Sequence, residues 1–243
     1  MTSALQQLLL PAECLLCHAL LAERDAGRIV CPVCRHRWRP VRPPWCERCG
    51  QPEPHFGPCR LCAGWPAALA LVRSAVWLAD GAREAVHALK YGGLPRIAED
   101  LADAMVGLFP APGSQPPPLL VPIPLAPKRL RERGYNQSEA LARALSRRCS
   151  IPMADVLVRS RETATQTALT PATRLANVAG AFDVRRDLLG SAARHTPHVT
   201  YVLVDDVFTT GATLAEAARA LEQAGARAVY GITFGRAVIP DFT

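Results

Sequence analysis

The residues best suited to chemistry in this chain of 243 residues lie in one short stretch, Tyr201–Leu214, which reads YVLVDDVFTTGATL. An apolar run leads to two adjacent acids, Asp205 and Asp206, and a loop of small and hydroxyl residues then opens into a helical pattern. Backbone N–H groups at the start of a helix, together with the helix dipole, bind anions. The stretch therefore predicts a phosphate site in the loop.

The residues expected to hold the phosphate are Thr209, Thr210, Gly211, Ala212 and Thr213. Carboxylates beside a phosphate would repel it, so Asp205 and Asp206 need a different partner. Two acceptors of this kind suit the 2′ and 3′ hydroxyls of a ribose whose 5′-phosphate lies in the loop. The alternative is an ordinary strand, a helix cap and two exposed acids, which leaves the combination of the two halves unexplained.

Eight of the nine cysteines form four Cys-x-x-Cys pairs, which are Cys14 with Cys17, Cys31 with Cys34, Cys46 with Cys49, and Cys59 with Cys62. Two such turns supply the tetrahedral four-sulfur set that zinc takes in structural sites. We predict two structural zinc ions with sequential pairing, which keeps each ribbon local. A crossed pairing, an iron–sulfur cluster and redox-active thiols are the alternatives. The ninth cysteine, Cys149, is expected to pack at a helix end.

The elements that position these groups alternate between strands and helices. Short apolar runs at Leu119–Ile123, Tyr201–Val204 and Ala228–Phe234 are typical of buried strands. Apolar residues repeat at helical spacing over Asn136–Arg148 and Thr213–Ala224. Units of this length predict an α/β fold with a doubly wound, mainly parallel sheet covered on both faces.

A second region precedes these units. Its patterns predict a strand at Val76–Leu78 and helices at Arg83–Leu89 and Ile97–Phe109. A proline-rich stretch without periodicity, 110–118, should form a stiff connector.

Composition points to a folded chain, since 49% of residues are hydrophobic and 20% are charged. The net charge of +7 comes mostly from arginine, because Lys90 and Lys128 are the only lysines. The first ten residues are too short and polar for a signal peptide, and no apolar run approaches the about 18–20 residues of a membrane span. We expect a cytoplasmic protein whose clustered thiols bind metal.

Residues 202–214 resemble the phosphoribosyl diphosphate (PRPP) signature of type I phosphoribosyltransferases. Further segments extend the likeness to the competence protein F (ComF) family over nearly the whole chain. These are the cysteine pairs, Leu89–Tyr91 with its following glycines, Val121–Pro124, Arg133–Gln137, Arg159–Gln166 and Arg174–Phe182. The resemblance implies that Asp205 and Asp206 bind the ribose hydroxyls of PRPP and that the threonine loop holds its 5′-phosphate.

The resemblance and the skew of the cysteines together predict two domains. Residues 1–65 would form a double zinc-ribbon module, and residues 66–243 a type I phosphoribosyltransferase domain. Within the latter, 66–118 would form a hood and connector, and 119–243 the core. The hood would set the acceptor specificity, which the sequence does not reveal.

The remaining parts of the site also follow from the resemblance. The loop after the first core strand should contact pyrophosphate through Lys128, Arg129 and Arg133, with a solvated basic face as the alternative. The stretch from Arg159 has the composition of a mobile lid, with Arg161 and Thr163 as its candidates, and a plain surface loop is the alternative. Mg²⁺ would accompany PRPP, bridging pyrophosphate and ribose oxygens.

Three functions are compatible with these features. The first is transfer of the 5-phosphoribosyl group to an unknown base or amine, the second is a PRPP or nucleotide sensor, and the third is a nucleic-acid-linked assembly factor. Members of the ComF family are implicated in natural transformation, which implies single-stranded DNA and DNA-uptake or helicase-type proteins as partners. Arginines interleaved with Trp38 and Trp45 suit single-strand binding, and equally suit packing of the module against the chain's own core.

Overall fold

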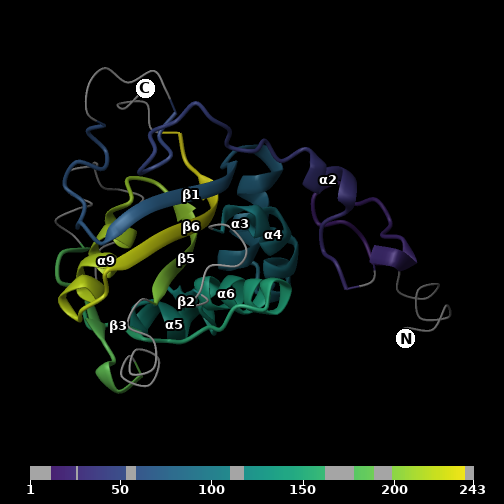
Figure 1. Cartoon of the computed structure of the whole chain (residues 1–243). Coiled ribbons are helices and arrows are strands. Elements are labelled where there is room, and N and C mark those ends of the chain that lie inside the picture. The colour runs from purple at the N-terminus through teal and green to yellow at the C-terminus, as the bar shows by residue number, and fades with distance from the viewer. Residues whose placement is uncertain are drawn as a thin grey trace.

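A computed structural model describes residues 12–25, 27–52, 59–109, 118–161, 178–188 and 199–238 (Figure 1). Its central sheet has four strands in the order β1 (Leu69–Trp77), β6 (Ala228–Arg236), β5 (Thr200–Phe208) and β2 (Leu119–Pro122). All three neighbouring pairs are parallel. The predicted α/β fold with a mainly parallel sheet is confirmed.

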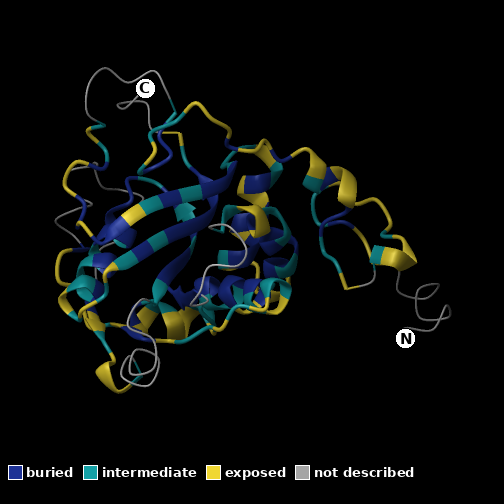
Figure 2. Ribbon diagram, viewed as in Figure 1, coloured by how far each residue is buried: buried dark blue, intermediate teal, exposed yellow. Residues whose placement is uncertain are grey.

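Helices cover both faces of this sheet. One face carries α9 (Ala212–Gln223), and the other carries α3 (Asp80–Tyr91), α4 (Ala98–Met105) and α6 (Gln137–Cys149). Successive residues of β5 alternate between the two sides, so Val202 and Val204 pack with α3, α4 and α6, while Tyr201 and Leu203 pack with α9. Burial on both faces, which colours most of β5 dark blue in Figure 2, explains why β5 reads as a continuous apolar run.

The segment before the expected core contributes a strand to the core sheet. β1 pairs with β6 from Leu69 to Trp77, so these nine residues form an edge strand rather than a short strand of a separate hood. The sequence did not predict the full length of this strand, because the polar residues Arg73 and Ser74 interrupt its apolar pattern. Ser74 tolerates burial because its hydroxyl is 2.7 Å from the hydroxyl of Thr233 on β6, within hydrogen-bond distance.

The helices expected in this segment are observed as α3 and α4, with changed ends. The second one is preceded by a 3-10 turn, η2 (Pro95–Ile97), and ends in another, η3 (Val106–Leu108). Gly107 lies in the last turn, where its low helix propensity favours the break. Of the expected connector, residues 110–117 lie outside the described residues. Cys149 is the last residue of α6, at a helix end as predicted.

The cysteine-rich segment covers the outer edge of β1. The Val41 amide donates to the Ala75 carbonyl at 3.0 Å, and the Trp77 amide donates to the Arg39 carbonyl at 2.8 Å. An uncovered edge strand would be open to pairing with another chain. This segment also holds the short helix α2 (Pro32–His36) and the 3-10 turn η1 (Glu23–Asp25).

The position of Trp38 favours packing against the core over single-strand binding, the two alternatives for the arginine–tryptophan pattern. Its side chain is 7% exposed and meets Phe234 edge-on, with ring centroids 5.0 Å apart. A ring buried in this way packs the module against the sheet and is not available for base stacking.

Two smaller elements complete the fold around the site. The helix α5 (Pro127–Arg133) follows β2, and the strands β3 (Leu157–Arg159) and β4 (Phe182–Val184) form an antiparallel pair. In the part of the chain that the structure describes, no helix has both the length and the apolar character required to cross a membrane.

Candidate functional site

The acid pair lies toward the carboxyl end of β5, along a cavity of about 410 Å³. Open parallel sheets bind ligands at this end of their strands. One oxygen of Asp205 accepts hydrogen bonds from the Ser138 hydroxyl at 2.8 Å and from the Asp206 amide at 2.9 Å. The Asp206 side chain is 4% exposed, and its Oδ2 lies 3.0 Å from Lys90 Nζ. Lys90 therefore reaches the acids from the last turn of α3.

The pKa values of Asp205 and Lys90 depend on burial and on the charges next to them. Burial, and then the charge of Asp206, raise the pKa of Asp205 to about 6, although Lys90 and Ser138 act in the opposite direction. Burial alone would lower the pKa of Lys90, but the Asp206 and Asp205 carboxylates outweigh it and raise that pKa. Above pH 6, an ionised Asp205 therefore lies near the Lys90 ammonium group.

The turn between α5 and α6 places Ser138 and Lys90 at this site. The Asn136 side chain caps α6 by accepting the Ser138 amide at 3.1 Å, and it donates to the Ile123 carbonyl at 3.0 Å. The Tyr135 hydroxyl donates to the carbonyl of the residue before Lys90. These contacts fix α6 and α3 relative to the end of β2.

The threonine loop lies along the same cavity. Thr209, Gly211, Ala212 and Thr213 line it, and α9 begins at Ala212. Gly211 has φ of +77°, a left-handed conformation that favours glycine. Thr210 is buried, and its hydroxyl accepts the Ala212 amide at 3.4 Å, so this residue supports the loop from behind. The first turn of α9 thus presents backbone N–H groups to the cavity.

Arginines supply the positive charge of the cavity wall. Arg129 and Arg133 come from α5 and Arg159 from the end of β3. Arg133 lies over the Tyr91 ring, 5.3 Å from its centroid. Burial, and then the charge of Arg129, lower the pKa of Arg159. A wall of this composition suits a ligand with several negative charges.

The other predicted cations lie elsewhere. Lys128 is exposed on α5 and does not line the cavity, because Arg129 and Arg133 are four residues apart on one helix face and Lys128 is not on that face. Arg161 is exposed, and its guanidinium donates to the Ala179 carbonyl at 2.6 Å. Thr163, the second lid candidate, lies outside the described residues.

Sequence reasoning assigned no site role to Ser138, and it named Lys90 and Arg159 only as members of the family-like segment Leu89–Tyr91 and of the expected lid. Lys90 carries a further signal, since it is one of two lysines in an arginine-rich chain. No spacing rule links it to Asp206, because the two residues belong to elements far apart in the sequence.

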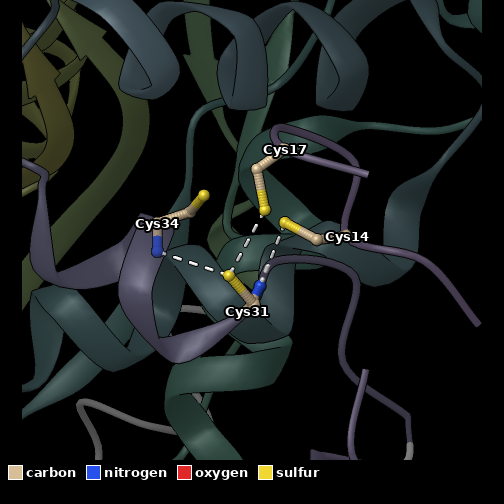
Figure 3. A group of neighbouring side chains, drawn as sticks. All are labelled: Cys14, Cys17, Cys31 and Cys34. Atoms are coloured by element: carbon tan, nitrogen blue, oxygen red, sulfur yellow. Dashed lines mark hydrogen bonds between the residues drawn. The ribbon is translucent and has the colours of Figure 1, made fainter. Parts of the chain in front are cut away.

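The clustered cysteines form two four-sulfur sites among the described residues. One consists of Cys14, Cys17, Cys31 and Cys34 (Figure 3), and the other of Cys46, Cys49, Cys59 and Cys62. Within each site all four sulfur atoms lie within 4.8 Å of one another. The sequential pairing predicted from the spacing is confirmed. We call these the first and the second cysteine site.

Distances and charge both fit zinc. A tetrahedral ion with Zn–S bonds of about 2.3 Å separates its sulfur ligands by about 3.8 Å. Sulfur atoms of Cys17 and Cys31 are 3.8 Å apart, as are those of Cys46 and Cys62. Burial, and then the neighbouring thiols, raise the pKa of Cys34, whereas backbone amides outweigh burial and lower the pKa of Cys14 to about 6. A cation is therefore needed for all four sulfurs of the first site to be thiolates. Each site would hold one structural Zn²⁺.

Two family models match the chain. A double zinc ribbon domain matches residues 5–63, which include all eight clustered cysteines. A phosphoribosyl transferase domain matches residues 135–236, which include the acid pair, the threonine loop and Arg159.

Relatives match most of the chain. It is 33% identical over 229 residues to the DNA utilization protein YhgH of Escherichia coli (strain K12), covering 91% of this chain and 96% of that protein. It is 27% identical over 229 residues to the competence protein ComFC of Bacillus subtilis (strain 168), covering 87% and 89%. Competence protein F of Haemophilus influenzae is 36% identical over 110 residues, 45% of this chain and 46% of that protein. The chain belongs to the ComF (competence protein F) family, with a phosphoribosyltransferase domain behind a double zinc ribbon.

Proposed function

We propose that the protein binds PRPP and transfers its 5-phosphoribosyl group to a nitrogen acceptor, releasing pyrophosphate. The observation that carries this proposal is one cavity lined by the acid pair, by residues of the threonine loop and by four arginines, Arg83, Arg129, Arg133 and Arg159. The 5′-phosphate would lie on Thr209–Thr213, and the ribose hydroxyls would face Asp205 and Asp206. The pyrophosphate would lie near Arg129, Arg133 and Arg159.

The reaction requires no nucleophile from the protein. The bond between C1 and the pyrophosphate oxygen breaks with its electron pair on that oxygen, while the acceptor's nitrogen lone pair forms the new bond to C1. The acceptor nitrogen then loses a proton to solvent. Fixed positions of the ribose and pyrophosphate, together with charge compensation by the arginines, supply the catalysis. Mg²⁺ bound with PRPP would neutralise part of the pyrophosphate charge.

The acid pair provides the test of PRPP binding. Each charge-assisted hydrogen bond contributes about 1.5–3 kcal/mol, so Asp205→Asn with Asp206→Asn should weaken PRPP binding about 100-fold or more. Asp183→Asn, an exposed acid on β4, is the control and should bind as the wild type does. Titration calorimetry gives the affinities, and circular dichroism checks the fold. Unchanged affinity in the double variant would refute the proposal.

Turnover has a separate test. The protein, PRPP, Mg²⁺ and a panel of bases and amines are incubated, and pyrophosphate is assayed. Release that depends on one acceptor identifies the substrate. PRPP binding without release for any acceptor would make the protein a PRPP sensor.

The names of the relatives favour a link to DNA as a second candidate function. The E. coli relative is named a DNA utilization protein, and two others are named competence proteins. In this chain Arg37, Arg39 and Arg42 are exposed on the cysteine-rich segment. Direct contact with single-stranded DNA would weaken steeply with salt, and absence of binding at low salt would exclude it. We also propose that DNA-uptake or helicase-type proteins are partners and that the protein is cytoplasmic. The boundary between the zinc-ribbon module and the phosphoribosyltransferase domain at residue 65 remains a proposal as well.

A further inference from the structure

The segment that follows the second cysteine site packs against the threonine loop through Trp65. Trp65 follows Cys62 by three residues, is 7% exposed, and meets Phe208 edge-on with ring centroids 6.2 Å apart. Phe208 is the last residue of β5, immediately before the loop. We propose that the second cysteine site is a positioning element for the loop, acting through Trp65, so that metal at this site sets the affinity for PRPP. This inference rests on the proposed function.

The closest contact lies at Gly211. A Cβ atom on this residue would lie 2.5 Å from Cζ2 of Trp65 and 2.8 Å from the ring of Phe208. The loop backbone therefore runs along a wall formed by these two rings, with no space for a side chain. Only glycine suits this position, because its φ is +77° and the rings leave no room for a Cβ atom. The position of the two rings therefore determines where the loop backbone runs.

A second connection runs through Arg236 at the end of β6. Its side chain is 2% exposed, and its guanidinium donates to the Cys49 carbonyl and to Gln51 Oε1, both at 2.9 Å. The same guanidinium lies over the Phe208 ring, 4.3 Å from its centroid. Phe208 is thus contacted by two residues, Trp65 and Arg236, that are each tied to the second cysteine site.

Arg48, inside the second cysteine site, holds Trp65 in place. Its guanidinium donates to the carbonyl of Cys62 at 3.2 Å, to that of Trp65 at 3.3 Å and to that of Pro66 at 2.7 Å. The backbone from the last cysteine to the tryptophan is therefore organised by a residue of the Cys46–Cys49 turn. Loss of metal would free both turns and, with them, the position of the Trp65 ring.

The first cysteine site has different neighbours. Asp100 of α4 accepts the amides of Ile29 and Val30, at 2.9 and 3.1 Å, just before Cys31. These hydrogen bonds connect the first cysteine site to α4, which packs on the face of the sheet opposite α9 and the threonine loop. The two sites, similar in chemistry, should therefore differ in their effect on PRPP.

A pair of tryptophan variants tests the contact with all eight cysteines intact. Trp65→Ala should raise the Kd for PRPP about tenfold or more, within the range of ordinary coupling between sites, and retain two zinc ions per chain. Trp38→Ala is the matched control, because Trp38 is also 7% exposed and also meets a phenylalanine edge-on. It should leave the PRPP affinity within about twofold of the wild type.

A pair of cysteine variants tests the metal. Cys59→Ser and Cys17→Ser should each reduce the zinc content from two ions to one. Hydrogen exchange of the amides of residues 208–214 should accelerate in Cys59→Ser and stay unchanged in Cys17→Ser. This readout needs no PRPP, so it reports on the loop even if another ligand occupies the cavity.

The outcomes separate the inference from the function on which it rests. Equal loop exchange and equal PRPP affinity in Cys59→Ser and Cys17→Ser would overturn the inference, as would wild-type affinity in Trp65→Ala. A wild-type protein that binds no PRPP, but whose loop exchange responds to Cys59→Ser alone, would refute the proposed ligand and support the coupling.

Discussion

The ion pair between Lys90 and Asp206 makes the charge of the ribose site depend on one ammonium group. Lys90→Met keeps the length of the side chain and removes its charge. At 3.0 Å between Nζ and Oδ2, the attraction is about 5.5 kcal/mol at an effective dielectric constant of about 20, and about 1.4 kcal/mol in water. The side chains of Lys90 and Asp206 are 24% and 4% exposed, so solvent screens the pair only in part and the attraction lies between these two values.

The direction follows from the acids. Asp205 has a pKa raised to about 6 by burial and by Asp206, with Lys90 opposing the rise. The wild-type site therefore has Asp205 ionised well above pH 6 and loses this charge as the pH falls through about 6. Without the Lys90 ammonium group, Asp205 binds its proton more tightly. The loss of affinity in Lys90→Met should then occur at a higher pH than in the wild type.

Titration calorimetry of PRPP between about pH 5.5 and 9 measures this shift. The phosphate of PRPP itself titrates near pH 6. This titration is the same with both proteins, so it cancels when the midpoint of the pH dependence of affinity is compared between the wild type and Lys90→Met. Lys90→Arg keeps the positive charge and should keep the wild-type midpoint. Coincident midpoints for wild type and Lys90→Met would refute the reasoning. A loss of affinity that is uniform across the pH range would instead make Lys90 a direct contact to PRPP.

Three further predictions concern the framework of the site. Asp100→Asn should lower the free energy of unfolding by about 2–4 kcal/mol in chemical denaturation, because the fully buried carboxylate accepts two backbone amides and lies 3.5 Å from Arg28; a change below about 0.5 kcal/mol would contradict this. Tyr135→Phe should lower the free energy of unfolding by about 1 kcal/mol, because it removes the hydrogen bond to the Leu89 carbonyl. Equal denaturation midpoints for this variant and the wild type would show that the bond contributes nothing. Gly211→Ala and Gly225→Ala both place alanine at a positive φ, which should lower the free energy of unfolding by about 1–2 kcal/mol each. Only the alanine at position 211 would clash with Trp65, so only Gly211→Ala should also abolish PRPP binding. Retained PRPP binding in Gly211→Ala would argue against the wall formed by the two rings.

The sequence alone determined those features whose chemistry is contiguous or regularly spaced. The two acids and the threonine loop occupy one stretch, so their joint role is readable from residue types. The Cys-x-x-Cys spacing predicted the metal sites and favoured sequential pairing, but it left a crossed pairing open until the structure grouped the sulfur atoms. The continuous apolar run at Tyr201–Val204 indicated a strand buried on both faces. The length of that strand was not readable, because pairing with β6 continues through Asp205 to Phe208.

Only the tertiary structure decided which distant residues complete the site. β1 belongs to the core sheet although it contains Ser74, because the buried Ser74 hydroxyl has a hydrogen-bond partner in Thr233 of β6. Lys90 contacts Asp206 because α3 packs, like α6, on the face of the sheet formed by Val202 and Val204 of β5. Arg236 reached Cys49, a partner 187 residues away, because the second cysteine site covers the end of β6. Such contacts depend on the complementarity of packed surfaces, and no periodicity along one chain encodes that complementarity.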